Sequence, residues 1–296
     1  KKAAANIRKF HEKQVRNSFI INDENGIVTW TAKCGADLNI SDDLFKAFVE
    51  EFEEDLDSVI CRAKEVGVCR IYMPNIDDTT LERLLDVYQQ YPDYCFPMLG
   101  YHPTSVDGDS MGKGFGMKKL LTEKHPFCAI GEVGLDLYWD KTYLKEQQKV
   151  LEEQIHWALE WDLPLIVHCR EAFPELFEVM RPYKKEGLSG IFHSFTGERG
   201  DVLELLDYPN FMIGINGVVT FKKSTLSQVL SDVPLERVVL EPDSPYLAPV
   251  PFRGKRNETS YIIKVAEKLA SVYDVDLEKI LSVTTRNALK VFKSAE

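Results

Sequence analysis

The sequence lacks any long hydrophobic run, and this limits the classes of protein that it can encode. No stretch approaches the roughly 18–20 apolar residues that a membrane-spanning helix needs, and no signal-peptide segment lies near Lys1. We therefore expect no membrane association. The composition, 44% hydrophobic and 28% charged over 296 residues, is that of a globular protein and excludes a disordered or collagen-like chain.

Paired cysteine motifs are also missing. The six cysteines form no Cys-x-x-Cys pair and have no even spacing, so a disulfide framework is not indicated. Several of them lie in apolar, strand-like runs, where a free thiol packs as a small hydrophobic side chain. We expect a reducing compartment and predict a cytoplasmic protein.

An excess of basic charge is lacking as well. The 36 Lys and Arg side chains against 47 Asp and Glu give a net charge of −11. A large, uniform surface for nucleic acid is therefore not expected, although a local basic groove is compatible with this total. The segment Lys1–Asn17 is basic, and we interpret residues 1–25 as an N-terminal extension.

Short apolar runs alternate with helical segments, which is typical of βαβ units and a parallel sheet. The seven clear strand-like runs are Val68–Pro74, Cys95–Tyr101, Phe127–Glu132, Leu163–Cys169, Gly190–Phe195, Phe211–Asn216 and Val238–Asp243. The helical segments are Asp55–Val66, Leu81–Gln90, Leu144–Glu160, Leu176–Lys184, Asp201–Leu206, Ser260–Val272 and Leu277–Phe292. With Gly26–Thr31 as the missing first strand, the pattern predicts an α/β fold, a (β/α)8 TIM barrel over residues 26–296. A doubly wound open sheet is the alternative, disfavoured because no Gly-rich phosphate turn follows that strand.

Polar side chains end most of the predicted strands. In a parallel barrel the carboxyl ends of the strands share one open face, which carries the functional groups. The residues in these positions are His102, Glu132, His168, His193, Asn216 and Asp243.

Imidazoles and carboxylates that converge without thiolates suit a divalent ion such as Mg²⁺, Mn²⁺ or Zn²⁺. We predict one or two ions per chain, with Glu132 as a bridge, His168 and His193 on one ion, and Asp243 holding the other or orienting the attacking water. Two ions about 3.5–4 Å apart can clamp a phosphodiester and activate water. We assign catalytic roles to Asp243 and Glu132.

Basic residues gather in the loops that should border this face. Arg170 follows the His168 strand, Lys222 and Lys223 follow the Asn216 strand, and Arg253, Lys255 and Arg256 follow Asp243. Arginine pairs with phosphate through two hydrogen bonds, so we predict that Arg170, Arg253, Lys255 and Arg256 bind substrate. His102 precedes Pro103; it either contacts substrate or caps a loop.

The motifs together resemble the TatD family of metal-dependent deoxyribonucleases. The resemblance is carried by GYHPTSV, AIGEVGLDLYWD, LPLIVHCREAF, GIFHSFTG, GINGVVTFKKS and LEPDSPYLAPVPFRGKRNE, and it runs almost unbroken from Phe48 to Phe292. It implies a barrel of the amidohydrolase type with activity on DNA, including 3′→5′ exonucleolytic cleavage. By resemblance Glu132 bridges two ions, His168 and His193 hold one, and Asp243 holds the other.

The sequence departs from this family at its first strand. Members carry Asp-Thr-His-x-His there, whereas this chain has no His-x-His, and no histidine lies between His11 and His102. The corresponding stretch, Trp30–Leu38, offers Lys33, Cys34, Gly35 and Asp37 instead. A smaller departure is Pro242, where the family usually has Thr.

Three interpretations of this departure stay open: a weakened one-ion hydrolase, a nonenzymatic relative that binds nucleic acid or a protein, or an N-terminal segment, residues 1–47, that is foreign to the family. Our prediction is a metal-dependent hydrolase of DNA phosphodiesters. The alternatives are a catalytically impaired binding protein and an ester or lactone hydrolase on the same scaffold. The sequence leaves the oligomeric state undetermined.

Overall fold

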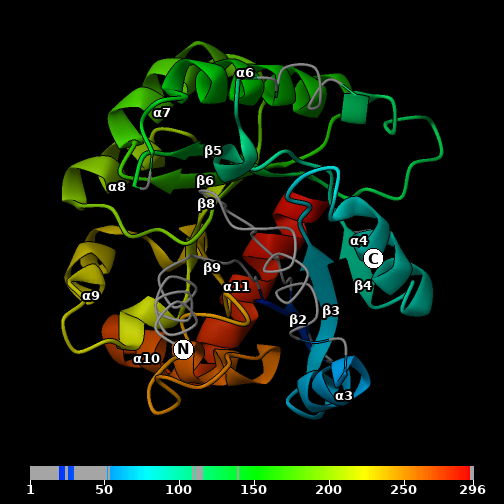
Figure 1. Cartoon of the computed structure of the whole chain (residues 1–296). Coiled ribbons are helices and arrows are strands. Elements are labelled where there is room, and N and C mark those ends of the chain that lie inside the picture. The colour runs from blue at the N-terminus through cyan, green and yellow to red at the C-terminus, as the bar shows by residue number, and fades with distance from the viewer. Residues whose placement is uncertain are drawn as a thin grey trace, which may run out of the picture.

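A barrel of parallel strands, wrapped by helices, organises the molecule (Figure 1). The computed structural model describes residues 20–23, 26–29, 52, 54–108, 110, 116–138 and 140–293. The parallel strands are β2 (Gly26–Thr29), β3 (Val68–Met73), β4 (Cys95–Pro97), β5 (Ile130–Asp136), β6 (Leu165–Arg170), β7 (Gly190–Phe192), β8 (Phe211–Ile215) and β9 (Val238–Leu240). A parallel bridge between Leu99 and Ile130 joins the chain after β4 to β5. The predicted TIM-barrel class is confirmed.

The first strand is where expected, but it belongs to a hairpin. β2 pairs in parallel with β3, as predicted for Gly26–Thr31. The additional strand β1 (Ile20–Asp23) pairs antiparallel with β2 and, through Ile20, with Leu240 of β9. The sheet therefore includes a segment that we had assigned to the N-terminal extension. Residues 1–19 and the stretch Trp30–Leu38 lie outside the described residues, so the domain boundary stays a prediction.

The helices lie on the outside of the sheet and follow the predicted alternation. They are α3 (Leu56–Glu65), α4 (Leu81–Gln90), α6 (Leu144–Glu160), α7 (Phe173–Met180), α8 (Arg199–Leu206), α9 (Leu226–Val229), α10 (Ile262–Tyr273) and α11 (Leu277–Phe292). The Asp276 side chain caps α11 by accepting the Lys279 N–H at 2.6 Å, and Asp274 ends α10 in a left-handed conformation at φ 51°. In the described part of the chain, no helix has the length and apolar character to cross a membrane.

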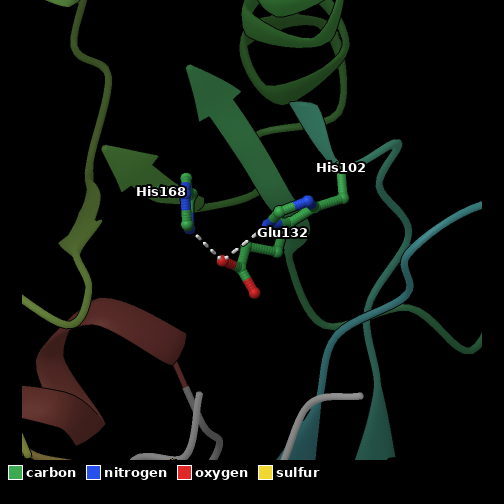
Figure 2. A group of neighbouring side chains, drawn as sticks. All are labelled: His102, Glu132 and His168. Carbon is green, nitrogen blue, oxygen red and sulfur yellow. Dashed lines mark hydrogen bonds and ion pairs between the residues drawn. The ribbon is translucent and has the colours of Figure 1, made fainter. Parts of the chain in front are cut away.

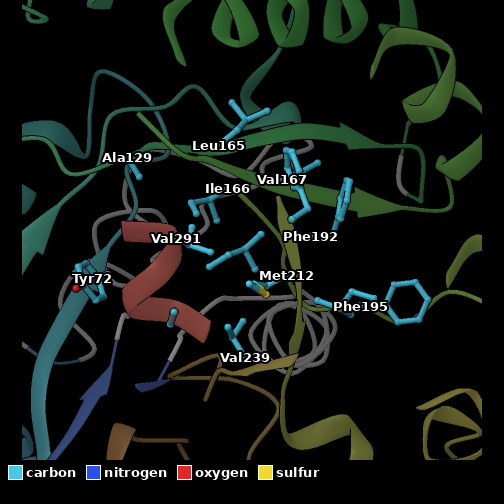
Figure 3. Close-up of a cluster of buried hydrophobic side chains, with 14 of the residues drawn as sticks. Tyr72, Ala129, Leu165, Ile166, Val167, Phe192, Phe195, Met212, Val239 and Val291 are labelled. Atoms are coloured by element: carbon cyan, nitrogen blue, oxygen red, sulfur yellow. The ribbon is translucent and has the colours of Figure 1, made fainter. Parts of the chain in front are cut away.

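The core is apolar and continuous between strands and helices. Residues of β5 to β9 are buried at nearly every position, as expected for strands covered on both faces. Figure 3 shows Ile166, Val167 and Phe192 of neighbouring strands packed in one cluster with Val291 of α11. This packing fixes the strand positions, and with them the polar residues at the strands' carboxyl ends.

Several predicted strand ends are wrong: β4, β7 and β9 end at Pro97, Phe192 and Leu240, before the predicted ends at Tyr101, Phe195 and Asp243, and β5 ends after its predicted end. We placed Glu132 at the end of a strand over Phe127–Glu132, whereas β5 begins at Ile130 and continues to Asp136. The strand continues because Val133 and Leu135 are fully buried and extend the apolar run past the charged residue. Glu132 therefore lies inside the barrel sheet.

Candidate metal centre

Glu132 is the centre of the site, and three imidazoles face one of its oxygens. Figure 2 shows two of them, His102 and His168, beside Glu132. Oε1 lies 3.1 Å from Nε2 of His102, 2.8 Å from Nδ1 of His168 and 2.6 Å from Nε2 of His193. These residues come from the loop after β4, from β6 and from the residue after β7. Glu132 and His102 have no exposed surface, and His168 and His193 have at most 3%. The predicted set of Glu132, His168 and His193 is thus brought together.

The sequence left two roles open for His102, capping a loop or contacting substrate. In the structure His102 caps a loop and also lies beside the site. Its Nδ1 accepts the N–H of Thr104 at 3.2 Å and so caps the short helix Pro103–Ser105, while Nε2 faces Glu132. Its predicted contact with substrate stays a prediction.

Asp136 fixes the orientation of His168. The Asp136 Oδ2 atom lies 3.0 Å from His168 Nε2, on the opposite side of the ring from Glu132. The other oxygen, Oδ1, accepts the backbone N–H of Tyr138 at 3.0 Å. The two strands approach closely here, because at Gly134, with φ 141°, an added Cβ would lie 1.9 Å from the carbonyl oxygen of His168. Glycine is thus required for His168 to lie where it does.

Two more buried carboxylates, those of Glu241 and Asp243, belong to the site. Asp243 Oδ2 accepts the Ser194 hydroxyl at 2.9 Å and an N–H of Asn216, whose Nδ2 also donates to Ser194 Oγ at 2.6 Å. Glu241 Oε1 accepts the backbone N–H of Ser194. Ser194 and Asp243 both have positive φ, at 48° and 57°, an uncommon conformation that often occurs at functional sites.

Burial and charge perturb these groups strongly. Burial opposes ionisation of Glu132, but the neighbouring imidazoles hold its pKa well below 4.5. Burial disfavours the charged form of His168, yet the carboxylates of Asp136 and Glu132 raise its pKa to about 9. Burial, reinforced by the charge of Asp243, raises the pKa of Glu241 well above its ordinary value, and burial does the same for Asp243. Without a cation, burial therefore favours the protonated, neutral forms of Glu241 and Asp243.

The residues fit a divalent cation. Three fully buried carboxylate oxygens, Glu132 Oε2, Glu241 Oε2 and Asp243 Oδ1, have no hydrogen-bond partner among the described residues. A buried carboxylate without a partner is costly, and a cation removes that cost. Ligand atoms lie within 4.8 Å of one another in each of two groups: His102, Glu132 and His168, and His193, Glu241 and Asp243. Both groups consist of the imidazole and carboxylate ligands that suit Zn²⁺, Mn²⁺ and Mg²⁺.

Two of the four predicted substrate-binding basic residues stack on aromatic rings near the strand ends. The Arg170 guanidinium lies 3.6 Å from the centre of the Tyr138 ring, and that of Arg253 lies 3.8 Å from the centre of the Phe221 ring. Arg170 ends β6, only two residues after His168. It is therefore well placed beside the centre, although its role in substrate binding stays a prediction.

The other two basic residues have different surroundings. Arg256 forms a two-bond ion pair with Asp55, with Nη1 2.8 Å from Oδ1, and its guanidinium lies over the Phe52 ring. This contact joins the loop after β9 to the start of α3. It also pairs the positive charge of Arg256, which we predicted to bind phosphate, with a carboxylate of the chain itself. Lys255 is exposed, 5.8 Å from the centre of the Phe252 ring. Their predicted contacts with substrate stay predictions.

Sequence reasoning missed Asp136, Glu241 and Ser194. A signal was present for both acids, because side chains two or four positions apart in an extended chain share a face. Glu132 and Asp136 follow this spacing in β5, and Glu241 precedes Asp243 by two residues. No pattern marked Ser194. The first-strand substitutes, Lys33, Cys34, Gly35 and Asp37, lie outside the described residues.

Comparison with known proteins gives a consistent family assignment. The family model of TatD-related DNases matches residues 46–293. The chain is 36% identical over 245 residues to an uncharacterized metal-dependent hydrolase, YabD, of Bacillus subtilis, covering 82% of this chain and 95% of that protein. It is 30% identical over 253 residues to the 3′-5′ ssDNA/RNA exonuclease TatD of Pectobacterium parmentieri, covering 83% and 96%.

A solved structure supports the fold. The TatD homolog YjjV from Escherichia coli superposes with a TM-score of 0.74 at 24% sequence identity, covering 83% of this chain and 94% of the other. At this identity the similarity shows the barrel architecture.

Proposed function

The chain belongs to the family of TatD-related DNases, and from this premise we propose that it is a metal-dependent hydrolase that cleaves phosphodiester bonds of single-stranded DNA from the 3′ end. The relative of Pectobacterium parmentieri is named as an exonuclease with this polarity, and it is matched over nearly its whole length. DNA as the substrate and the direction of cleavage are both part of the proposal.

One observation carries the proposal. Three buried carboxylates each keep an oxygen without a partner among the described residues, and three buried imidazoles converge on Glu132, at the face of the barrel where strands end. A binding protein without chemistry has no use for so many buried acids, because each one costs stability unless a cation compensates it.

Each residue has a distinct task in the proposed reaction. When bound, a divalent ion lowers the pKa of a water molecule and offsets the charge of the phosphate. Glu132, His168 and His193 would hold one ion. Asp243 is fixed through Oδ2 by Ser194 and Asn216, which leaves Oδ1 either to hold the other ion or to orient the attacking water and accept its proton.

The mouth of the site would bind the nucleic acid. Arg170 and Arg253 each pair a guanidinium with an aromatic ring, and such surfaces bind phosphates and unstacked bases together. These pairs favour a single strand over a duplex, because bases that can reach an aromatic ring must be unstacked. A cytoplasmic location belongs to the same proposal; the free thiols of Cys61, Cys95, Cys128 and Cys169 are consistent with it.

A polarity assay tests the function. Purified protein with Mn²⁺ or Mg²⁺ is incubated with single strands labelled at either end, and with circular single-stranded DNA. We expect progressive shortening of the 5′-labelled strand, early release of a 3′ label, resistance of the circle, and no cleavage after chelation or in Glu132→Gln. Cutting of the circle would show an endonuclease. No cleavage of any nucleic acid, with hydrolysis of simple esters or lactones instead, would refute the proposed substrate.

A further inference from the structure

Helix α6, on the outside of the barrel, carries two buried glutamines. Gln147 is 4% exposed and Gln154 is 1% exposed. They are seven positions apart, which is about two helical turns, so both side chains lie on the same face of the helix. A buried amide without hydrogen bonds costs stability, so the partners of these two side chains show what the side chains do.

Each glutamine pairs with both backbone groups of a single residue. The Asp136 N–H donates to Gln147 Oε1 at 2.9 Å, and Gln147 Nε2 donates to the Asp136 carbonyl oxygen at 3.2 Å. The Tyr101 N–H donates to Gln154 Oε1 at 2.6 Å, and Gln154 Nε2 donates to the Tyr101 carbonyl oxygen at 3.2 Å. Each amide thus holds one backbone segment through two hydrogen bonds, as the backbone of a neighbouring strand would.

Gln147 acts next to His168. It holds the backbone of Asp136, whose carboxylate oxygen Oδ2 lies 3.0 Å from His168 Nε2. Asp136 is the last residue of β5, where the chain leaves the sheet. A shift of this backbone would move the carboxylate relative to the imidazole, so the amide on α6 determines how Asp136 meets His168.

Gln154 acts in the same way next to His102. Tyr101 directly precedes His102, in the stretch between β4 and the short helix Pro103–Ser105. The Tyr101 carbonyl belongs to the peptide group that leads into His102, so holding this carbonyl orients the start of His102. The imidazole of His102 in turn places Nε2 at 3.1 Å from Glu132 Oε1.

We infer that Gln147 and Gln154 are positioning residues, through which α6 sets the places of two imidazoles of the metal centre. Gln147 acts on His168 by way of Asp136. Gln154 acts on His102 by way of the preceding peptide group. Groups that orient a ligating histidine change metal affinity although they do not touch the ion. The inference rests on the proposed metal-dependent function, but the ion binding that tests it requires no cleavage.

Double-mutant cycles, measured by isothermal titration of Mn²⁺, test this inference. We expect Gln147→Met and Gln154→Met each to weaken Mn²⁺ binding by about three- to ten-fold, less than the loss of a direct partner of a ligating histidine. Because Gln147 acts through Asp136, Gln147→Met should cause no further loss in an Asp136→Ala background. Gln154→Met should keep its full effect there and have none in a His102→Ala background.

The matched control is Leu151→Ala, because Leu151 lies between the two glutamines on the same face of α6 and has no exposed surface. This change removes apolar packing and no side-chain hydrogen bond. We expect it to lower the urea midpoint at least as much as the glutamine variants do, yet to bind Mn²⁺ within two-fold of the wild type. Gln147→Asn, whose shorter amide cannot reach both backbone groups, enters the cycle if Gln147→Met does not fold.

Nitrogen-15 NMR of the imidazoles in the metal-free protein gives a second measurement. The His168 signals should shift in Gln147→Met, and the His102 signals in Gln154→Met, while Leu151→Ala leaves both unchanged.

Two results would overturn the inference. The first is a loss from Gln147→Met that is equally large with and without Asp136→Ala, which would show that Gln147 does not act through Asp136. The second is a Leu151→Ala protein that loses as much Mn²⁺ affinity as the glutamine variants, which would show that α6 acts through stability alone. If the wild type binds Mn²⁺ yet cleaves no DNA, the proposed function fails and the inference stands. If the wild type binds no Mn²⁺, the proposed function fails as well, and the imidazole shifts alone decide the inference.

Discussion

Replacing Asp136 by Asn should weaken ion binding by reversing the tautomer of His168. Asp136 Oδ2 faces His168 Nε2 at 3.0 Å, so in the wild type with an ion bound we expect Nε2 to carry the proton and Nδ1 to offer its lone pair to the ion beside Glu132. The Tyr138 N–H donates to Oδ1 and fixes which atom of an Asn side chain takes that position. The amide NH₂ would then face Nε2, which must accept. The proton moves to Nδ1, the nitrogen that should bind the ion.

The expected size follows from this geometry. Residues that orient a ligating histidine are worth about 10–100-fold in metal affinity, or about 1.4–2.7 kcal/mol. We expect Asp136→Asn to fall in this range for Mn²⁺, measured by isothermal titration, with a matching loss in kcat/KM. Asp136→Ala removes the carboxylate without placing an N–H against Nε2, so it should lose less. Nitrogen-15 NMR of the imidazoles gives the tautomer independently.

The matched control is Asp207→Asn, since Asp207 pairs with Lys184 on the outer surface. It should bind Mn²⁺ as the wild type does. If Asp136→Asn binds Mn²⁺ within three-fold of the wild type, or if Asp136→Ala is the weaker of the two variants, the tautomer reasoning is wrong.

Three further predictions concern the same site. Gly134→Ala should lower the free energy of unfolding by about 1–3 kcal/mol in urea titrations, because its Cβ would meet the His168 carbonyl; an unchanged midpoint would contradict this. In the metal-free protein, stability should fall between pH 6.5 and about 9, because the raised pKa of His168 means that the folded state holds a proton that the unfolded chain releases; a flat or rising thermal midpoint would contradict it. Adding Mn²⁺ at about 100 times its Kd to chelated protein should stabilise it by about 2.7 kcal/mol, and less in Glu132→Gln.

Much of the fold was predictable because the helical spacing of apolar residues in the sequence matches the faces that the helices bury. The predicted segments Leu81–Gln90, Leu144–Glu160 and Leu277–Phe292 coincide with α4, α6 and α11. In contrast, α7 begins at Phe173, three residues before its predicted start, because Pro174 fits the first turn of a helix. We did not predict strand β1. Its four residues are too few to show an alternating pattern, and its antiparallel pairing with β2 depends on the fold of the whole sheet.

The site was predictable where a polar residue interrupts an apolar strand. Glu132, His168, His193 and Asp243 stood out in this way, and the structure places them close together. The sequence could not show that Arg256 pairs with Asp55, some 200 positions away, because a basic loop looks the same whether it binds phosphate or another part of the chain. The spacing of Glu241 and Asp243 indicates a shared face, but the sequence could not show that the Glu241 carboxylate has room there, since that depends on Gly214 in a neighbouring strand.

The acidic interior gives the ions a second role in the proposed reaction. The chain carries a net charge of −11, and the buried, ionised Glu132 and Asp136, whose pKa values are lowered, would repel a phosphodiester that approached the metal-free site. Bound cations reverse the local charge, so the affinity for single-stranded DNA should rise with Mn²⁺ occupancy even in a variant that cannot cleave. Asn216→Ala is suited to the measurement, because it removes a hydrogen bond that fixes Asp243, the proposed base, and so should impair cleavage without removing a ligand. If its DNA affinity is the same with and without Mn²⁺, the basic loops alone bind the strand, and the ions serve only the chemical step.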